Sequence, residues 1–433
     1  MKHTAQRIFR ETLAGIDIRA TTARKLAREG SRIHAGTAIF DLSEFREIVA
    51  IAYGKASIAM ADGLSEVLAP DFPPEGILVA PVAPAHELSR WKTFVGGHPL
   101  PNSGSFAAGR AILDRLARCD ERTLVIFLIS GGGSSLVELP LDPALTLEDF
   151  QKLHAALVTC GAPIEKINAV RKHFSATKGG RLAAAAPLAT KLTLAISDVP
   201  TGEESALASG PTLPDNTTAH DAQQIVKEYG VLEKLPHLVR AALEHGKLAE
   251  TSKKDDPCFA RTHFELLLGA HDLTHAAHHA CEVAGYVCLC DNSTDNWPIE
   301  KAAEHLLAVL HLQIAANPGK RVGVIASGEV SSPVAGDGIG GRNSAFVLAC
   351  VEKIAGKKIV ILSAGTDGID GNSPAAGAIA DGETLARAHA RHLVPRDFMH
   401  RSDAYNFFER LGDAIITGPT GNNLRDLRIF LAE

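Results

Sequence analysis

A loop rich in glycine and serine is the stretch of this sequence best suited to hold an anion. The apolar run 124–129, typical of a buried strand, is followed directly by Ser130-Gly131-Gly132-Gly133-Ser134-Ser135. Glycines let backbone N–H groups turn toward a ligand, and the serine hydroxyls add donors. The segment favours a phosphate or carboxylate ligand, and a tight turn without ligand is the alternative for the loop taken alone.

Four other apolar runs also end in polar, mostly glycine-bearing segments. These segments are Ser197-Asp198, Ser327-Gly328-Glu329, Ser363-Ala364-Gly365-Thr366-Asp367-Gly368 and Thr417-Gly418-Pro419-Thr420-Gly421. Open α/β sheets bind ligands beyond the carboxyl ends of their strands. Five such strand ends therefore predict one enzymatic cleft.

Charged side chains stand at these strand ends. Lys55 follows a glycine after the predicted strand 48–52 and can place a point charge on a phosphate or carboxylate. Three acids have the chemistry of Mg²⁺ ligands or of a general base: Asp198, Glu329 and Asp367. The P-loop signature is absent, because Ala56 follows the lysine.

Two further segments carry basic residues. Arg171-Lys172-His173 and Lys178-Gly179-Gly180-Arg181 follow Asn168, and a solvated helix face is an equal alternative for them. The segment 336–341 matches G-x-G-x-x-G, but it starts about ten residues after a strand, so a nicotinamide site is disfavoured. It is better explained as a glycine loop that presents Arg342 and Asn343 at the start of a helix.

Several other groups are explained without chemistry. Asp370 precedes Gly371 and suits a cap or an Asx turn. The histidines of 271–279 lack zinc-site spacing and are expected on a helix surface. Cys288 and Cys290 alternate on a predicted strand, where core positions are favoured over a metal site.

Composition limits the class of protein. The 433 residues favour two domains, and 45% hydrophobic residues can bury ample core. A net charge of -6 without a long basic run argues against a nucleic-acid partner. The chain has no apolar run of membrane-spanning length and no secretory segment, and seven cysteines without a paired framework favour a reducing cytoplasm.

The order of elements predicts an α/β protein. Strand-like runs alternate with helical patterns, which indicates parallel sheets covered by helices on both faces. The charged segment 228–257 lacks strand character and is the predicted boundary. We therefore expect two α/β/α sandwich domains, an N-terminal Rossmann-like domain at 1–245 and a C-terminal domain at 258–433.

These motifs together resemble those of the class II glycerate 2-kinases, which join a Rossmann-like domain to a MOFRL domain and are often labelled hydroxypyruvate reductases. The matching stretches run in order through nearly the whole chain. They are Gly54-Lys55-Ala56, Gly97-His98-Pro99, Ser130 to Ser134, Asn168 to Arg181, Ile196-Ser197-Asp198-Val199, Ala208-Ser209-Gly210-Pro211-Thr212, Gly340-Gly341-Arg342-Asn343, Gly365 to Gly371 and Thr417 to Gly421.

The resemblance implies ATP-dependent phosphorylation of D-glycerate at the 2-hydroxyl, with Mg²⁺, in a cleft between the domains to which the last residues of the chain return. It implies a small-molecule substrate and allows a homodimer. The catalytic residues it implies are Lys55, Arg342 and Asp198. The cofactor-binding residues it implies are Ser130, Gly131, Gly132, Gly133, Ser134, Lys178, Gly341, Asn343 and Asp367. The substrate-binding residues are Lys55, His98, Asn168, Arg171 and Arg342, and the metal ligands Asp198 and Glu329.

The chain departs from the family pattern in two places. Ser344-Ala345 stands where the family usually has Gln-Glu, and Asn372-Ser373-Pro374 replaces the usual Pro-Thr-Asp. Roles are therefore not transferred to these positions, and nucleotide preference stays open. A hydroxypyruvate reductase using NAD(P)H is the alternative function. The residues at the strand ends also favour phosphoryl transfer, because that chemistry requires mainly positioning and charge neutralisation.

Overall fold

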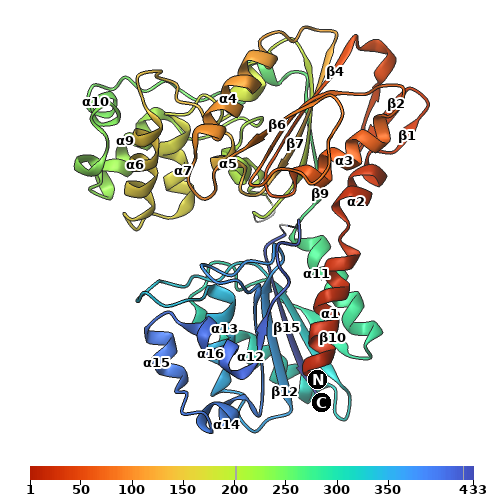
Figure 1. The fold of residues 1–433 in the computed structure, drawn as a ribbon, viewed down its shortest axis with the longest axis vertical. Helices are drawn as coiled ribbons and strands as arrows, with labels where there is room; N and C mark the ends of the chain where they lie inside the picture. The colour runs from red at the N-terminus through yellow and green to blue at the C-terminus, as the bar shows by residue number, and fades with distance from the viewer. Residues whose placement is uncertain (200–201, 423) are drawn as a thin grey trace. The chain divides into compact units, whose positions relative to one another are not determined.

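The computed structural model describes residues 1–199, 202–422 and 424–433. The chain forms two compact units (Figure 1). The first unit is Ile18–Leu267, and the second unit combines Met1–Asp17 with Leu268–Glu433. Among the described residues, no helix combines the length and the apolarity needed to cross a bilayer.

The first unit is built on a six-stranded sheet with the order β6-β5-β4-β7-β8-β9. The pairs from β6 to β8 are parallel. Their strands are almost wholly buried at the centre, where both faces are covered. The bounds are β4 (Glu47–Tyr53), β5 (Glu75–Ala80), β6 (Trp91–Val95), β7 (Thr123–Ser130), β8 (Thr190–Ile196) and β9 (Thr262–Leu268).

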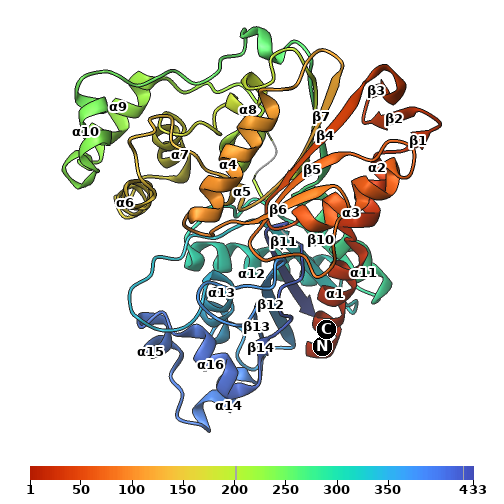
Figure 2. The same cartoon turned by 45° about the horizontal axis from the view of Figure 1, so that its top comes forward.

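Helices cover both faces of this sheet, as the sequence predicts. In Figure 2, α2 (Ile18–Lys25) and α3 (Ser57–Leu68) lie on one side of the strands. On the other side lie α4 (Ser103–Leu116) and α8 (Arg181–Ala184), whose apolar residues pack in one cluster with alternate residues of the strands. The same unit also contains a small antiparallel sheet of β1 (Arg28–Glu29), β2 (Arg32–Ala35) and β3 (Ala38–Asp41).

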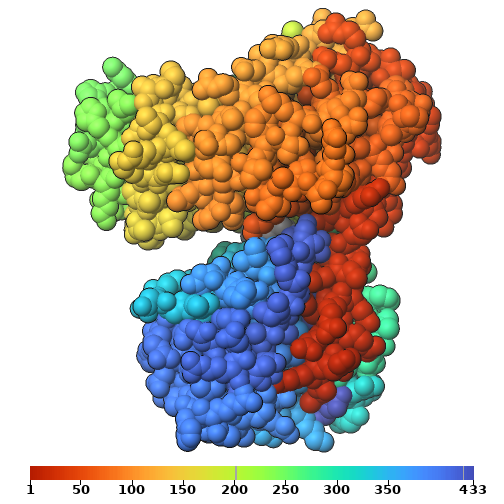
Figure 3. All heavy atoms as spheres, viewed as in Figure 1, coloured from red at the N-terminus to blue at the C-terminus, as the bar shows by residue number. Residues whose placement is uncertain are grey.

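The first unit also contains a group of helices with its own apolar core. These helices come from the segments between β7 and β8 and between β8 and β9. In Figure 3 they appear as the yellow and green end of this unit. The bounds are α6 (Leu147–Val158), α7 (Ile164–Lys172), α9 (Ala219–Glu228) and α10 (His237–Glu244). The charged segment 228–257 thus lies inside the first unit, because Val231, Leu235, Val239 and Leu243 pack into this core.

The second unit contains a mixed sheet with the order β10-β11-β15-β12-β13-β14. Only β10 and β11 pair in parallel, so the expectation of a parallel sheet is wrong here. The reason is that β15 runs antiparallel to both of its neighbours at the centre. The bounds are β10 (Val287–Cys290), β11 (Val322–Ser327), β12 (Ile359–Gly365), β13 (Gly377–Asp381), β14 (Ala414–Ile415) and β15 (Asp426–Ala432).

Helices also cover both faces of the second sheet. One face packs against α12 (Ile299–Ala316), α13 (Arg342–Val351), α15 (Pro395–His400) and α16 (Ala404–Leu411), with α14 (Thr384–His389) at the edge. On the other face lie α1 (Lys2–Gly15) and α11 (Ala270–Val283). The second unit is therefore an α/β/α sandwich as well.

The two units divide the chain at positions other than the predicted domain bounds. The apolar face of α1, with Ile8 and Phe9 buried, packs on α11, β12 and β15, so residues 1–17 join the second unit. Strand β9 extends the first sheet, so the chain passes between units at 267–268. The last residues form β15 at the centre of the second sheet.

The cysteines also differ from expectation. Cys281 of α11 and Cys288 of β10 form a disulfide, with their Cα atoms 6.6 Å apart. Strand β10 is an edge strand, so Cys290 is exposed and is not a core residue. Cysteine counting missed this pair because the two residues are only brought together by the packing of α11 on β10.

Candidate active site

In the first unit, Lys55 stands beside the glycine loop. The N–H of Lys55 donates to the carbonyl of Gly131 (2.9 Å), and the N–H of Ala56 donates to Ser130 Oγ (3.0 Å). Adjacent parallel strands β4 and β7 make this meeting possible, because their carboxyl ends lie at the same edge. The structure thus joins two strand ends that are 74 residues apart in sequence.

Gly132 is a position in the loop where a side chain would be strained. Its φ of +79° is left-handed, a conformation that favours glycine. A Cβ there would lie 3.1 Å from His98 Cδ2 and 3.3 Å from Lys55 Cγ. Gly132 therefore lets the side chains of Lys55 and His98 approach the loop together. The short helix α5 (Gly133–Leu136) follows directly.

A line of polar side chains runs from the loop to helix α7. Ser134 Oγ and Ser209 Oγ are 2.9 Å apart, and Ser209 Oγ donates to Asn168 Oδ1 (3.3 Å). Arg171 Nη1 also reaches Asn168 Oδ1, at 3.5 Å. Asn168 and Arg171 share one face of α7 because they are three residues apart. The helix therefore presents an amide and a guanidinium toward the glycine loop.

Positive charge exceeds negative charge in this part of the first unit. Lys178 and Arg171 are both buried, and Glu138 is the carboxylate that acts on both of them. Lys178 Nζ donates to Glu138 Oε2 at 2.5 Å, while burial lowers the pKa of Lys178 to about 8. Burial and the charges of Arg171 and Lys178 lower the pKa of His154 to about 4, so its imidazole is neutral. Two buried cations that share one anion favour binding of a second anion.

The predicted basic cluster therefore divides into two groups with different positions. Arg171 lies on the line of side chains that leads to the glycine loop, whereas Lys178 is buried and its ammonium pairs with Glu138. Arg181 is held by backbone carbonyls, including those of Ser175 (2.9 Å) and Glu250 (3.0 Å).

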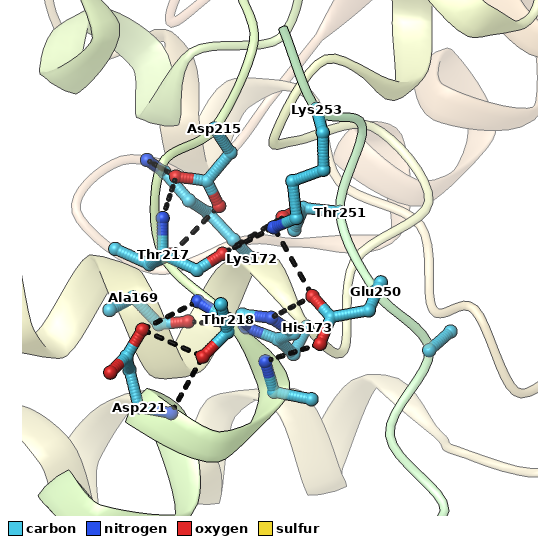
Figure 4. Close-up of polar contacts among 12 residues, drawn as sticks. Ala169, Lys172, His173, Asp215, Thr217, Thr218, Asp221, Glu250, Thr251 and Lys253 are labelled. Atoms are coloured by element: carbon cyan, nitrogen blue, oxygen red, sulfur yellow. Dashed lines mark hydrogen bonds and ion pairs between the residues drawn. The ribbon is translucent and has the colours of Figure 1, made fainter. Parts of the chain in front are cut away.

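The remaining members of the cluster fix helix α7 in place (Figure 4). Lys172 Nζ donates to Asp215 Oδ1 (3.0 Å), and Asp215 also accepts from the Thr217 N–H (3.2 Å). His173 Nδ1 donates to the carbonyl of Ala169 at 2.7 Å, and burial lowers the pKa of this imidazole. The network ties α7 to the segment that precedes α9, so it positions Asn168 and Arg171 without facing the loop itself.

Asp198 follows β8 in a half-buried turn. Because β8 pairs in parallel with β7, this turn lies at the same edge of the sheet as Ser130. The turn is shaped by Ser197, whose Oγ accepts from the Val199 N–H at 3.2 Å. The first unit thus brings Asp198 to the edge that carries Lys55 and the glycine loop.

In the second unit, Arg342 is the first residue of α13, as the sequence predicts. Its Nε donates to Asp426 Oδ2 (2.5 Å), and its Nη2 contacts Asp426 Oδ1 (3.3 Å) and Glu329 Oε1 (2.7 Å). Burial alone would lower the pKa of Arg342, but the two carboxylates outweigh it and raise the pKa above its usual value. The guanidinium is therefore held in one orientation by a fork of charged hydrogen bonds.

Sequence reasoning missed Asp426 and its neighbour Arg428. Asp426 is 2% exposed, and Arg428 is fully buried, with Nη2 3.8 Å from Asp426 Oδ2. Burial would raise the pKa of Asp426, yet Arg342 and then Arg428 lower it, so the carboxylate is ionised. The available signal was the pair of charged residues at alternate positions of the apolar strand 426–432.

Asp370 caps α13 from a separate loop. Its carboxylate accepts from the N–H groups of Asn343 and Ser344, both at 2.9 Å. Asp370 is therefore a helix cap, as one of the two predicted roles, but the helix that it caps begins 28 residues earlier in the sequence. Asn343 is buried and its Oδ1 accepts from Ser363 Oγ (2.6 Å), so this side chain supports the helix end from inside. Gly341, the residue before α13, packs against the backbone of Asp370.

The acids proposed for a metal lie on both units. Asp198 belongs to the first unit, while Glu329 and Asp367 belong to the second. Glu329 pairs with Arg342, and Asp367 Oδ1 accepts from the Ile369 N–H (3.0 Å). Outside residues 200, 201 and 423, no group of three or more His, Cys, Asp or Glu side chains is arranged to hold a metal ion. The carboxylate oxygens suit Mg²⁺, which needs few protein ligands when water and phosphate complete its shell.

The fold and the charged strand ends are those of an α/β enzyme. Comparison with known proteins is more specific. Residues 4–244 match the family described as "Domain of unknown function (DUF4147)", and residues 322–426 match the MOFRL family. The D-glycerate 2-kinase of Thermotoga maritima is 34% identical over 388 residues, which cover 89% of this chain and 90% of that protein.

Two further comparisons agree. A putative hydroxypyruvate reductase of Agrobacterium vitis is 36% identical over 88% of this chain and 86% of its own. The crystal structure of glycerate kinase from Thermotoga maritima superposes with a TM-score of 0.83 at 30% identity, covering 100% of this chain and 99% of the other. The chain therefore belongs to the glycerate 2-kinase family with DUF4147 and MOFRL domains.

Proposed function

We propose that this enzyme transfers the γ-phosphoryl group of ATP to the 2-hydroxyl of D-glycerate and releases 2-phospho-D-glycerate and ADP. The observation that carries the proposal is the surplus of positive charge in this part of the first unit: the buried Arg171 and Lys178 share one buried carboxylate, Glu138, and Lys55 lies beside the glycine loop. Glycerate and ATP are both anions, and family relatives are named as kinases of glycerate.

Each group has a role that follows from its chemistry. The loop 130–134 offers N–H and hydroxyl donors to phosphate oxygens. Asn168 and Arg171 on α7, with His98 beside the loop, suit the carboxylate and hydroxyls of glycerate. We assign Lys55 and Arg342 to neutralising charge as the phosphoryl group moves, because phosphoryl transfer depends on positioning and electrostatics.

Lys178 and Asn343 receive indirect roles in this proposal. Lys178 pairs with Glu138 and adds positive charge near Arg171, while its own ammonium is buried. Asn343 and Gly341 fix the start of α13 and thereby the backbone that carries Arg342.

Mg²⁺ is the metal that fits the oxygen-rich acids at the strand ends. When bound, it supplies positive charge to the phosphate oxygens of ATP. Asp198 is our first candidate for holding it, directly or through water, and the alternative role for Asp198 is to accept the proton of the glycerate hydroxyl. Glu329 and Asp367 are the further candidates.

The reductase alternative is less well supported. Two relatives carry that name, but the G-x-G-x-x-G segment at 336–341 does not follow β11 directly. The segment is held by other contacts: the Gly338 N–H donates to the carbonyl of Arg401 (3.0 Å), and the Ile339 N–H donates to Asp403 Oδ1 (3.0 Å). A dinucleotide fingerprint requires the glycines at the strand-to-helix turn.

One assay separates the two functions. Purified enzyme is given D-glycerate, ATP and Mg²⁺ with ADP release coupled to a reporter, and separately hydroxypyruvate with NADH or NADPH. We expect ADP release that depends on glycerate and no oxidation of the nicotinamide. Oxidation of NAD(P)H without ADP release would reject the kinase proposal.

Variants then test the assigned residues. Lys55→Ala and Arg342→Ala should each lower kcat by about 10²-fold or more, since removing one preorganised charge-stabilising group has that effect. The matched control is Arg122→Ala, whose side chain is exposed in the first unit. Near-normal kcat in Lys55→Ala or Arg342→Ala, with an unchanged melting curve, would remove that residue from the proposed machinery.

Location and assembly are part of the same proposal. We assign the protein to the cytoplasm; five of the seven cysteines are free thiols, and Cys281 and Cys288 form a disulfide. We expect a homodimer or a monomer without nucleic-acid partners, which size-exclusion chromatography with light scattering can measure.

A further inference from the structure

A groove in the first unit gathers positive charge away from the candidate active site. It lies between the amino-terminal ends of β5 and β6 and the carboxyl-terminal half of α4, which contacts both strands. Its volume is about 530 Å³. We call it the β6–α4 groove; its side chains of interest are Ile77, Arg90, Lys92, Phe94, Arg110 and Arg118.

Four cations of this groove have no carboxylate partner. Arg90, Lys92, Arg110 and Arg118 are exposed, and within the described part of the chain none of their side chains makes an ion pair or a hydrogen bond. By contrast, Arg115 in the same groove pairs with Glu47 (2.8 Å) and Glu75 (3.2 Å). The carboxylates of Glu47 and Glu75 are therefore already paired with another arginine.

Asp114 is the other acid of the groove. It lies on α4 four residues after Arg110, a spacing that permits a helix-surface ion pair, and four residues before Arg118, which follows the helix. Asp114 makes an ion pair with neither arginine in the described part of the chain. Even with Asp114 counted, the groove holds five cationic and two anionic side chains on a chain of net charge -6. This local excess is opposite in sign to the whole protein.

The floor of the groove is apolar. Ile77 and Phe94 line it, and Lys92 Nζ lies 5.1 Å from the centre of the Phe94 ring. Cations above an aromatic and aliphatic floor suit a small organic molecule that carries several phosphate groups better than they suit a single inorganic ion.

The groove is separate from the site at the carboxyl strand ends. Its strand residues Glu75, Gly76, Ile77 and Lys92 come from the amino-terminal halves of β5 and β6, and Phe94 is the fourth of the five residues of β6. Lys55 and the glycine loop, by contrast, follow the carboxyl ends of β4 and β7. The strand β4 has seven residues, and at about 3.3 Å per residue the two ends of the sheet are roughly 20 Å apart. One ligand of metabolite size cannot occupy both places.

We propose that the β6–α4 groove is a second anion site that binds a small molecule with two or more phosphate groups. Arg90 and Lys92 on one wall and Arg110 and Arg118 on the other each supply a pair of cations, one pair for each phosphate. Binding here does not involve the proposed catalytic residues, and the proposal stands whichever reaction the enzyme performs.

The test uses tripolyphosphate as the probe and Trp91 as the reporter. The ring of Trp91 lies against Gly76, which lines the groove, and the chain has two tryptophans, so Trp297→Phe leaves Trp91 as the single fluorophore. Tripolyphosphate is added at constant ionic strength, balanced with KCl. We expect a saturable change in Trp91 fluorescence that KCl alone does not produce.

Two sets of variants locate the binding. In Arg110→Ala/Arg118→Ala, which changes one exposed residue of α4 and one exposed residue just after it, the affinity for tripolyphosphate should fall at least about tenfold. Lys92→Gln provides a second variant in case the helix is disturbed. Lys55→Ala and the control Arg122→Ala should bind as the unaltered chain does. A response that is lost in Lys55→Ala and retained in the arginine pair, or that KCl reproduces, would overturn the proposal.

Discussion

Replacing Asp426 by asparagine should separate the orientation of Arg342 from the stability of the second unit. Asp426 accepts two hydrogen bonds from the Arg342 guanidinium, and its Oδ2 lies 3.8 Å from Nη2 of the fully buried Arg428. Asp426→Asn keeps the shape and one acceptor oxygen but removes the charge. Arg342 is then left with Glu329, and the buried Arg428 loses the charge of the carboxylate that lies 3.8 Å from its Nη2.

The size of both effects follows from burial. Removing one partner of a buried ion pair costs about 3–5 kcal/mol, and asparagine should lie at the lower end because it still accepts a hydrogen bond. For a unit of this size that corresponds to a fall in Tm of roughly 6–12 °C. If Asp426 orients Arg342 for transfer, kcat should also fall by about 10²-fold while KM for glycerate changes little.

The matched control is Asp413→Asn. Asp413 is also buried in the second unit and pairs with Lys2 (2.8 Å) and Arg387, but it contacts neither Arg342 nor Glu329. Melting curves and steady-state ADP release are measured for both variants, with kinetics taken well below either Tm. Similar losses of Tm with a fall in kcat only for Asp426→Asn would confirm the positioning role. Equal kcat in the two variants would refute it and leave Asp426 as a stabilising residue alone.

Three further predictions concern the first unit. Burial lowers the pKa of Lys178 to about 8, whereas this side chain has a pKa of about 10.4 in the unfolded chain. Because the unfolded state binds more protons between these two pKa values, the contribution of Lys178 to the free energy of unfolding rises with pH from about 8 to 10. Urea unfolding of Lys178→Met at several pH values should lack this rise. Gly132→Ala should lower kcat/KM at least about tenfold, because the methyl group would displace His98 and Lys55 and φ is +79°; unaltered kinetics would show that the loop tolerates a side chain. If Asp198 holds the metal, Asp198→Asn should raise the Mg²⁺ concentration needed for half activity; if Asp198 is the base, the variant should lower kcat at unchanged Mg²⁺ dependence. If neither change is observed, the acid group is assigned to Glu329 or Asp367.

Local sequence patterns predicted the elements that carry the candidate site. The strands that precede Lys55, Ser130, Asp198 and Glu329 were all found near their predicted bounds, because continuous apolar runs specify strands buried on both faces. The start of α13 at Arg342 followed from the glycines before it. The α/β/α layering of both units likewise follows from the alternation of strands and helices.

The pairing of charges required the tertiary structure. Lys178 has the sequence context of a phosphate ligand, yet packing buries it against Glu138, which is 40 residues away. Asp426 reaches Arg342 across 84 residues, since β15 lies at the centre of a mixed sheet whose order no local pattern specifies. The division of the chain at 17–18 and 267–268 has the same origin, because α1 buries its apolar face on a sheet formed by residues far along the chain. Sequence thus determined which residues stand at strand ends, because that depends on local hydrophobic patterning. Tertiary structure decided which of those residues neutralise one another, because burial and strand order set the distances between charges that are remote in sequence.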